Sequence, residues 1–180
     1  MATAADTRSK ISEICNASMQ KTLELQIRSF QPGDEFSFRE LNEAWIGKYF
    51  TIEEADRLVL EDPVAKILQP GGHILMAIVG QKAIGCCALL ANGAEEFELA
   101  KMAVLESERG RGIGRKLIER AIEYARNLGA ARLYLETNRK LPNAIHLYES
   151  VGFRHVSPNA IPPTPYARAN VFMEMKLRDL

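Results

Sequence analysis

The stretch Glu106–Ala125, "ESERGRGIGRKLIERAIEYA", joins a glycine-rich loop to a strongly periodic helix pattern. The loop alternates three glycines with arginines: Gly110, Gly112 and Gly114 stand among Arg109, Arg111 and Arg115. Glycine readily adopts the positive φ that turns backbone N–H groups inward as an anion-binding concavity. The helix that follows adds unpaired N–H groups and the positive end of its dipole. The stretch therefore predicts a site for a phosphate group, with pyrophosphate as the favoured ligand.

An ordinary flexible turn before a helix is the plain alternative, because a glycine motif alone is weakly specific. The spacing Gly110-x-Gly112-x-Gly114 differs from the dinucleotide-binding fingerprint, and no strand–helix–strand unit precedes it. The Walker A pattern of nucleotide hydrolases is also absent from the sequence. Both observations argue against a nucleotide-binding fold of either type.

The composition is that of one ordinary globular domain. The chain has 180 residues, of which 47% are apolar and 26% charged, enough to bury a substantial core. Its 23 basic and 23 acidic residues balance, so no global field predicts a nucleic-acid or membrane partner. No apolar run reaches the length of a membrane span or of a signal-peptide core. These features favour a cytoplasmic location.

Cysteine and histidine usage predicts neither a disulfide framework nor a metal site. The three cysteines are Cys15, Cys86 and Cys87, an odd number without the Cys-x-x-Cys spacing of zinc sites. Cys86 and Cys87 fall in a predicted strand, where we expect them to pack rather than to react. His73 and His146 have no metal-type partners nearby in the sequence. We therefore expect no metal cofactor.

Hydrophobic periodicity divides the chain into a polar N-terminal extension, 1–21, and a single domain, 22–180. The predicted strands are 22–30, 73–79, 82–91, 97–105, 131–137, 153–156 and 170–177. The predicted helices are 34–50, a second one opened by a Thr51-x-x-Glu54 capping box, 112–128 and 142–151. Antiparallel strands followed by alternating strands and helices indicate a mixed α/β fold. We expect a mostly antiparallel sheet of six or seven strands.

Several motifs together resemble one known family. Arg109-x-x-Gly112-x-Gly114 resembles the Gln/Arg-x-x-Gly-x-Gly/Ala signature of the GNAT superfamily of acyl-CoA-dependent N-acetyltransferases. The segments "ELAKMAV", "AIHLYESVGF" and "YARANVFMEMKL" are similar to that family's fourth strand, its Ala-x-x-x-Tyr-x-x-x-Gly-Phe segment and its terminal strand. The likeness covers 22–180 in the order of elements and is sequence-specific over 97–153. It implies helices on both faces of the sheet and a splay between the fourth and fifth strands.

The resemblance implies acetyl-CoA as co-substrate, with its pyrophosphate held by the backbone amides of 109–115. The pantetheine arm would pair with the free edge of the fourth strand, as an added strand does. The family often has an asparagine where this chain has Leu141, which leaves Asn138 and Asn143 as nearby polar alternatives. The implied cofactor contacts are Met102, Ala103, Val104, Arg109, Gly110, Arg111, Gly112, Ile113, Gly114, Arg115, Asn138 and Asn143.

Glu98 is the candidate general base, because an amine must lose a proton to attack a thioester. It stands in an apolar strand, at the place of the catalytic glutamate in the family's histone-acetylating branch. Without a bulge, Glu98, Ala100, Met102 and Val104 share one face of the strand. A backbone N–H near Val104 is the expected oxyanion donor. The alternative is a solvated glutamate at a strand start, with no catalytic part.

Tyr148 matches the family residue that protonates the departing thiolate or donates a hydrogen bond to its sulfur. It also belongs to an apolar helical stripe with Ala144, Leu147 and Val151, so core packing is the alternative.

The acceptor pocket is expected between the first two helices and the proline-rich loop that precedes the last strand. Trp45, Tyr49 and Phe50 either line this pocket or belong to the core. Arg168 is either a receptor for a substrate carboxylate or a surface charge. Lys101, inside a predicted strand, either pairs with a nearby carboxylate or anchors an acidic acceptor.

Two functions remain open at this level. The first is an enzyme that transfers an acetyl group from acetyl-CoA to a primary amine of a small molecule or peptide by direct attack. The second is a protein of the same fold that binds acyl-CoA without catalysis, as a sensor or pseudo-enzyme. The presence of both Glu98 and Tyr148 favours the enzyme. The expected partners are acetyl-CoA and the amine acceptor, and the oligomeric state is open, a homodimer included.

Overall fold

A computed structural model describes residues 24–178, so the predicted extension 1–21 and Cys15 lie outside the described residues. The strands are β1 (Leu25–Ser29), β2 (His73–Val79), β3 (Lys82–Asn92), β4 (Glu96–Val104), β5 (Arg132–Thr137), β6 (Arg154–His155) and β7 (Val171–Lys176). The main helices are α2 (Glu35–Tyr49), α3 (Glu54–Glu61), α4 (Ile113–Asn127) and α5 (Pro142–Ser150). Short helical turns are η1 (Val64–Leu68), η2 (Glu106–Glu108) and η3 (Pro158–Ala160).

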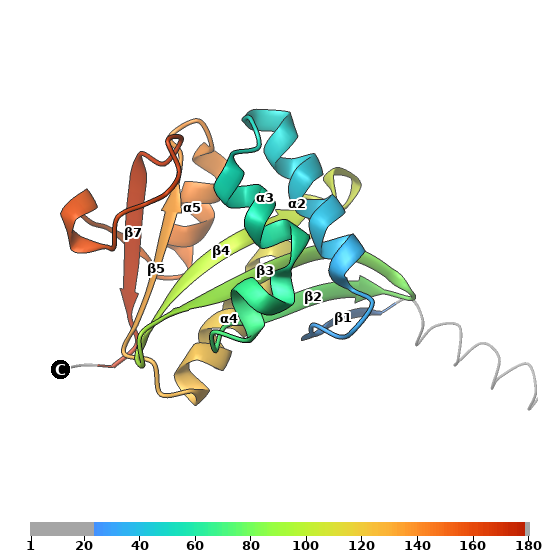
Figure 1. The fold of residues 1–180 in the computed structure, drawn as a ribbon, viewed down its shortest axis with the longest axis horizontal. Coiled ribbons are helices and arrows are strands. Elements are labelled where there is room, and N and C mark those ends of the chain that lie inside the picture. Colours follow the sequence, from blue (N-terminus) through green and yellow to red (C-terminus); the bar gives the residue numbers. More distant parts are fainter. Residues whose placement is uncertain (1–23, 179–180) are drawn as a thin grey trace, which may run out of the picture.

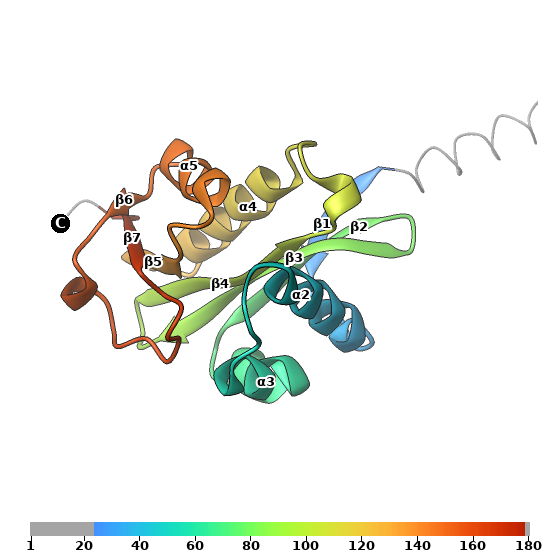
Figure 2. The ribbon, with the colours of Figure 1, turned by 90° about the horizontal axis from the view of Figure 1, so that it is seen from above.

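The described strands form one seven-stranded sheet in the order β1-β2-β3-β4-β5-β7-β6. Every neighbouring pair is antiparallel except β4 and β5, which run parallel. Helices α4 and α5 cover one face of the sheet, and α2 and α3 cover the other (Figures 1 and 2). The predicted mixed α/β fold, with a mostly antiparallel sheet between two helical layers, is confirmed.

Each face of the sheet has its own apolar core. On one face, the periodic apolar stripe of α4 packs against inward-facing residues of β2 to β5 and β7. Its buried members are Ile113, Leu117, Ile118, Ala121, Ile122 and Ala125. On the other face, Phe38, Leu41 and Ile46 of α2 pack against β2 and β3. Cys86 and Cys87 point to opposite cores and are both buried, which fits the packing role expected of them.

The local turn signals act as the sequence predicts. Gly80 has a φ of 63° in the two-residue turn between β2 and β3, and Gly129 has a φ of 75° just after α4. Both are conformations that residues with a Cβ atom rarely adopt, which is why glycine stands there.

The start of the second helix differs from the prediction. Helix α3 begins at Glu54, and the capping box is formed by Glu53 and Asp56 rather than by Thr51 and Glu54. The Glu53 N–H donates to Asp56 Oδ2 at 3.1 Å. Asp56 and Glu53 are also fixed by residues far away in the sequence, as described below, so tertiary contacts select this cap. The π-helical turn η1 was not predicted either.

Candidate active site

A separation between β4 and β5 opens the centre of the sheet. Only Glu96, Phe97 and Glu98 of β4 pair with β5, opposite Arg132, Leu133 and Tyr134. Beyond Glu98 the two strands diverge, and the gap between them is visible in Figure 1. The expected splay is therefore present, and it leaves the end of β4 without a strand partner on that side.

A pocket fills this opening and reaches both faces of the sheet; we call it the central pocket. Its lining includes Trp45, Phe50, Asp56, Glu98, Lys101, Met102, Glu136, Asn138, Leu141, Tyr148, Tyr166 and Arg168. These residues come from α2, α3, β4, β5, α5 and the loop before β7. Both proposed catalytic residues, Glu98 and Tyr148, thus line one pocket.

A bulge in β4 changes which residues face the pocket. Ala88 of β3 pairs with Ala100, whereas Cys86 pairs with Ala103, so β4 has one extra residue between these pairs. Lys101 lies within this interval with a φ of 50°, an unusual value for a residue other than glycine. The condition attached to the strand prediction therefore fails, because a bulge intervenes.

The bulge moves Met102 and Val104 to the face opposite Glu98. Both pack against the core under α4, whereas Ala103 is buried in the core under α2. Lys101 remains on the α2 and α3 face, where its ammonium group reaches Asp56. Because a bulge intervenes, Glu98, Ala100, Met102 and Val104 do not share one face.

Glu98 lines the central pocket, is partly buried, and has no hydrogen-bond or ion-pair partner among the described residues. Burial raises the pKa of its carboxyl to about 7, repulsion by Glu136 adds to the rise, and Lys101 opposes it. A carboxylate with this pKa can take up a proton near neutral pH and release it again. The interpretation as an idle, solvated glutamate does not fit these surroundings.

Tyr148 lies on α5, on the other side of the opening. Its ring packs edge-on against Phe153 at 6.0 Å between centroids, and its hydroxyl donates to Met102 Sδ at 3.8 Å. Burial raises the pKa of this phenol to about 12. The ring is thus part of the core, and the residue also lines the pocket, so the two interpretations of Tyr148 are compatible.

The glycine loop places a row of free amides at the end of β4. Gly110 and Gly112 both have a φ of 76°, and a Cβ atom on either would meet nothing within 4 Å. Within the described chain, the backbone N–H groups of 110–115 have no hydrogen-bond acceptor, and the first helical bond is Lys116 N to Gly112 O. The concavity that the sequence predicts for an anion is therefore open and lined with donors.

Ile113 and Gly114 have packing roles in addition. The Ile113 side chain is buried in the core under α4. A Cβ atom on Gly114 would lie 3.1 Å from Met102 Cε and 3.3 Å from Leu147 Cδ2. Glycine at this position therefore lets α4 approach β4 and α5 closely, next to the pocket.

The arginine side chains of the loop are engaged with protein groups. Arg109 donates to the Val104 carbonyl oxygen at 3.2 Å and to the Tyr49 hydroxyl at 3.0 Å, which ties the loop to β4 and α2. Arg111 pairs with Glu108 at 2.5 Å, and Arg115 donates to Ser150 Oγ at 2.7 Å. Arg111 and Arg115 are exposed and add positive charge, but the free donors of the loop are backbone amides.

The two asparagines named as cofactor contacts lie in different surroundings. Asn138 is buried and lines the central pocket; it donates to the Arg168 carbonyl oxygen and accepts from Lys140 N–H at 2.8 Å. Asn143 is exposed in the first turn of α5. Leu141, at the place of the family asparagine, is buried against the pocket. Asn138 therefore fixes the loop before β7.

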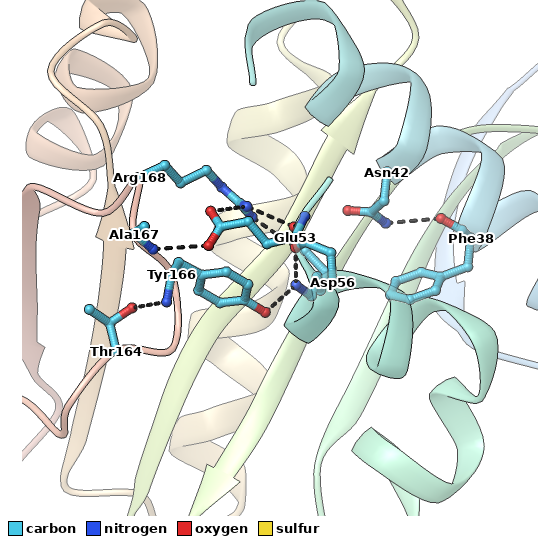
Figure 3. A network of polar contacts seen from close by, with 9 residues as sticks. Phe38, Asn42, Glu53, Asp56, Thr164, Tyr166, Ala167 and Arg168 are labelled. Atoms are coloured by element: carbon cyan, nitrogen blue, oxygen red, sulfur yellow. Dashed lines mark hydrogen bonds and ion pairs between the residues drawn. The ribbon is translucent and has the colours of Figure 1, made fainter. Parts of the chain in front are cut away.

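An ion-pair network that sequence reasoning missed closes one side of the pocket (Figure 3). Asp56 is fully buried. Its carboxylate accepts hydrogen bonds from the two terminal guanidinium nitrogens of Arg168, at 2.7 and 2.8 Å, and from the Lys101 ammonium group at 2.9 Å. Lys101 also donates to the Tyr166 hydroxyl at 2.6 Å, and Glu53 pairs with Arg168 at 2.8 Å. Burial alone would raise the pKa of Asp56, but Arg168 and Lys101 outweigh it and lower the pKa.

The network decides two alternatives that the sequence left open. Lys101 pairs with a carboxylate of the protein, Asp56, and Arg168 is held by Asp56 and Glu53. Neither cation is free to receive a carboxylate of the substrate. The sequence contains one weak signal of this network: a lysine stands inside the strand β4, and acidic residues stand at the start of α3.

The aromatic residues of α2 divide between the two roles considered for them. Trp45 and Phe50 line the central pocket and contact each other at 6.2 Å between ring centroids. Tyr49 does not line the pocket and instead accepts the hydrogen bond from Arg109.

Residues 24–178 contain no group of three or more His, Cys, Asp or Glu side chains placed to hold a metal ion. In the same range, no helix has both the length and the apolar character that crossing a membrane requires.

A single sheet between two helical layers, opened between parallel β4 and β5 and followed by a loop of free amides after β4, defines an acyl-CoA-dependent acyltransferase fold. The sequence model of the acetyltransferase (GNAT) family matches residues 22–153. The chain therefore belongs to the GNAT family of acetyltransferases, as the motifs predicted.

Relatives of known sequence agree with this assignment. An uncharacterized N-acetyltransferase of Schizosaccharomyces pombe is 30% identical over 76% of this chain and 88% of its own length. YjgM, an uncharacterized N-acetyltransferase of Escherichia coli, is 43% identical over 40% of this chain, and that match spans only 43% of its own length.

Solved structures show the same fold. A GNAT-family acetyltransferase of Staphylococcus aureus superposes with a TM-score of 0.80 at 24% identity, over 86% of this chain and all of its own. YncA of Salmonella typhimurium, a putative acetyltransferase solved with acetyl-CoA, has a TM-score of 0.69 at 20% identity, over 87% of this chain and 96% of its own.

Proposed function

We propose that this member of the GNAT family transfers an acetyl group from acetyl-CoA to a primary amine by direct attack within the central pocket. The observation that carries the proposal is the central pocket itself, which Tyr148 and the partnerless Glu98 both line. Membership of the family, and a neighbour of the same fold solved with acetyl-CoA, support the choice of acyl donor.

The cofactor enters from the face that α4 and α5 cover. The free amides of 110–115 bind its pyrophosphate, since they combine unpaired donors with the start of α4. The pantetheine arm lies along Met102 to Val104, where β4 has lost β5 as a partner. The acetyl group then reaches the opening in the sheet, and the amine comes from the α2 and α3 face.

The oxyanion donor belongs at the bulge rather than near Val104. Each residue of a strand advances the chain by about 3.3 Å, so Val104 lies roughly 20 Å along β4 from Glu98. A single thioester group is too small to lie beside Glu98 and beside the Val104 N–H at the same time. The N–H of Met102, directly after the bulge, is closer to Glu98 along the strand, and we assign it this role.

Each proton that moves in the reaction needs a donor and an acceptor. The amine nitrogen attacks the thioester carbon, and Glu98 takes the proton that the nitrogen loses. The tetrahedral intermediate collapses with cleavage of the carbon–sulfur bond, and the thiolate leaves. A phenol with a pKa of about 12 holds its proton more tightly than a thiol of pKa about 8.5, so full transfer from Tyr148 is unfavourable. Tyr148 therefore stabilises the thiolate as a hydrogen-bond donor, and solvent supplies the proton.

The test is release of coenzyme A thiol from acetyl-CoA in the presence of a panel of amines, peptides and aminoglycosides. Turnover that depends on the amine, together with formation of the N-acetyl product, is the expected result. A rise in melting temperature with coenzyme A but no turnover with any amine would instead support the non-catalytic, acyl-CoA-binding alternative.

A further inference from the structure

The charges that line the central pocket do not balance. The two cations, Lys101 and Arg168, are both held by Asp56, and Arg168 also pairs with Glu53. The remaining two carboxylates of the lining, Glu98 and Glu136, have no cation within ion-pair distance among the described residues. The charge of the pocket that is left uncompensated is therefore negative.

Glu98 and Glu136 lie on the same face of adjacent strands. Glu98 pairs in register with Tyr134, and Glu136 lies two residues further along β5, so its side chain points the same way as that of Tyr134. Phe97, Leu99, Leu133 and Leu135 point into the opposite core, which confirms this orientation. Both carboxylates thus project toward the α2 and α3 face, where the amine arrives.

Glu136 carries a buried oxygen without a partner. Its Oε2 atom is inaccessible to solvent and has no partner at full hydrogen-bond geometry, although the Thr164 side chain lies close enough to stabilise the charged carboxyl. Burial raises the pKa of this carboxyl even though Thr164, Arg168 and Lys101 act in the opposite direction. A buried acceptor left unpaired destabilises the folded protein, and native structures rarely retain one without a use. A cation bound in the pocket, which Glu136 lines, would compensate the charge of this carboxylate.

The surroundings also define the rest of the ligand. Two residues along a strand and one strand across separate the Cα atoms of Glu98 and Glu136 by roughly 8 Å. Trp45, Phe50 and Leu141 give the same pocket an apolar wall. Such a wall suits methylene groups that connect two nitrogens.

We propose that the preferred acceptor is a short aliphatic diamine, with one nitrogen acetylated beside Glu98 and the other bound as an ammonium ion by Glu136. The inference rests on the proposed acetyl transfer and specifies its substrate class. It also excludes acceptors with a carboxylate at the far end, because that group would face Glu136 while Lys101 and Arg168 are occupied.

Three acceptors of nearly equal length test the proposal on the wild-type protein: 1,4-diaminobutane, n-butylamine and 4-aminobutanoate. They share a chain of four carbons and differ at the far end, which has an ammonium group, no polar group or a carboxylate. We expect kcat/KM for the diamine to exceed that for n-butylamine at least tenfold, since the second ammonium gains a charge-assisted hydrogen bond. We expect 4-aminobutanoate to be the poorest of the three.

The variant Glu136→Gln keeps the shape of the side chain and removes its charge. It should lower the preference for diaminobutane over butylamine at least tenfold, mainly through a higher KM for the diamine. Glu43→Gln, which removes a partly exposed carboxylate of α2 that pairs with Arg39, is the control and should retain the wild-type preference. If Glu136→Gln fails to fold, the comparison of the three acceptors on the wild-type protein still tests the proposal.

The outcomes separate this inference from the proposed function. Acetylation of n-butylamine or 4-aminobutanoate as efficient as that of the diamine would overturn the diamine assignment and leave acetyl transfer intact. A preference that survives Glu136→Gln would overturn the role of Glu136. Absence of turnover with every amine would overturn the proposed function and the inference together.

Discussion

Glu98 acquires its proposed role from its surroundings. As a free side chain it would be ionised at neutral pH, but burial and Glu136 raise its pKa to about 7. An acid–base group with a pKa near the working pH is present in both protonation states and can exchange protons rapidly.

The variant Glu98→Gln tests this at the scale of one residue. It keeps the shape and removes the basicity, so the rate should fall by about 10²–10⁴-fold, while coenzyme A affinity stays near wild type. For the wild type, the slope of log kcat/KM against pH should decrease by about one unit near pH 7, as Glu98 becomes ionised. The variant should lose this break in the pH profile.

Glu96→Gln is the control, because Glu96 lies two residues earlier on the same strand and pairs with Arg132. It should retain both the rate and the break. A Glu98→Gln protein with wild-type rate and profile would show that another group accepts the proton.

The raised pKa of Glu98 also has a consequence for stability. The pKa of this carboxyl is 4.5 in its ordinary state and about 7 in the folded protein. Between these two pH values the folded protein binds more protons at Glu98 than the unfolded chain does. The contribution of Glu98 to the free energy of unfolding therefore decreases as pH rises through this window. Urea titrations of wild type and Glu98→Gln at several pH values would measure the difference.

Tyr148→Phe separates the ring of Tyr148 from its hydroxyl. The ring contact with Phe153 remains, so stability should change by about 1 kcal/mol or less. The rate should fall at least tenfold if the hydroxyl stabilises the thiolate, and less with an acyl donor whose thiol is more acidic. Tyr124→Phe on α4 is the control and should leave the rate unchanged. Equal slowing with both donors would contradict the role assigned to the hydroxyl.

At the scale of an element, the loop before α4 combines two roles of glycine. Gly110 and Gly112 supply positive φ beside open space, whereas Gly114 supplies close packing against Met102 and Leu147. The free amides of 110–115 depend on the first role, and the approach of α4 to β4 depends on the second.

Gly112→Asp should abolish the rise in melting temperature that coenzyme A produces. The new carboxylate enters the concavity and repels the pyrophosphate, while ligand-linked stabilisation requires binding to the folded state. Gly93→Asp is a matched control: Gly93 also has a positive φ, 78°, with nothing within 4 Å, but it lies in the turn between β3 and β4. An unchanged shift in folded Gly112→Asp would exclude the loop from the binding site.

At the scale of the whole molecule, the opening between β4 and β5 joins the two faces of the sheet into one pocket. Asp56 holds three distant segments around it: α3, the bulge of β4 and the loop before β7. The side chains of Asp56 and Lys101 are almost completely buried, so each requires the other to compensate its charge.

Asp56→Asn should destabilise the protein by about 3–5 kcal/mol, because it leaves a buried Lys101 charge without its partner. Glu53→Gln, which removes a partly exposed partner of Arg168, should cost about 1 kcal/mol or less. The lowered pKa of Asp56 means that its stabilisation is present above the pKa of the unfolded chain and is lost as pH falls through the folded value. Urea unfolding measures each change; equal losses in the two variants would contradict a central role for Asp56.

Local patterns in the sequence were sufficient for most of the elements and for the open loop of glycines before α4, whose role as an anion site stays a prediction. The apolar period of α4, the glycines at its start and the turn at Gly80 act over a few residues, so they can be recognised without the rest of the chain. Glu98 and Tyr148 were also found in this way, since each stands in a segment with a recognisable motif, although their roles stay predictions.

The tertiary structure alone decided which side chains meet in the pocket. The bulge at Lys101 arises from the register of β4 against β3, and it reverses the faces of Met102 and Val104 without leaving a trace in the apolar pattern. The contacts of Asp56 with Lys101 and Arg168 bridge 45 and 112 positions of the chain. Burial and charge pairing between such distant segments are properties of the folded state, so the pKa of Glu98 is determined only there.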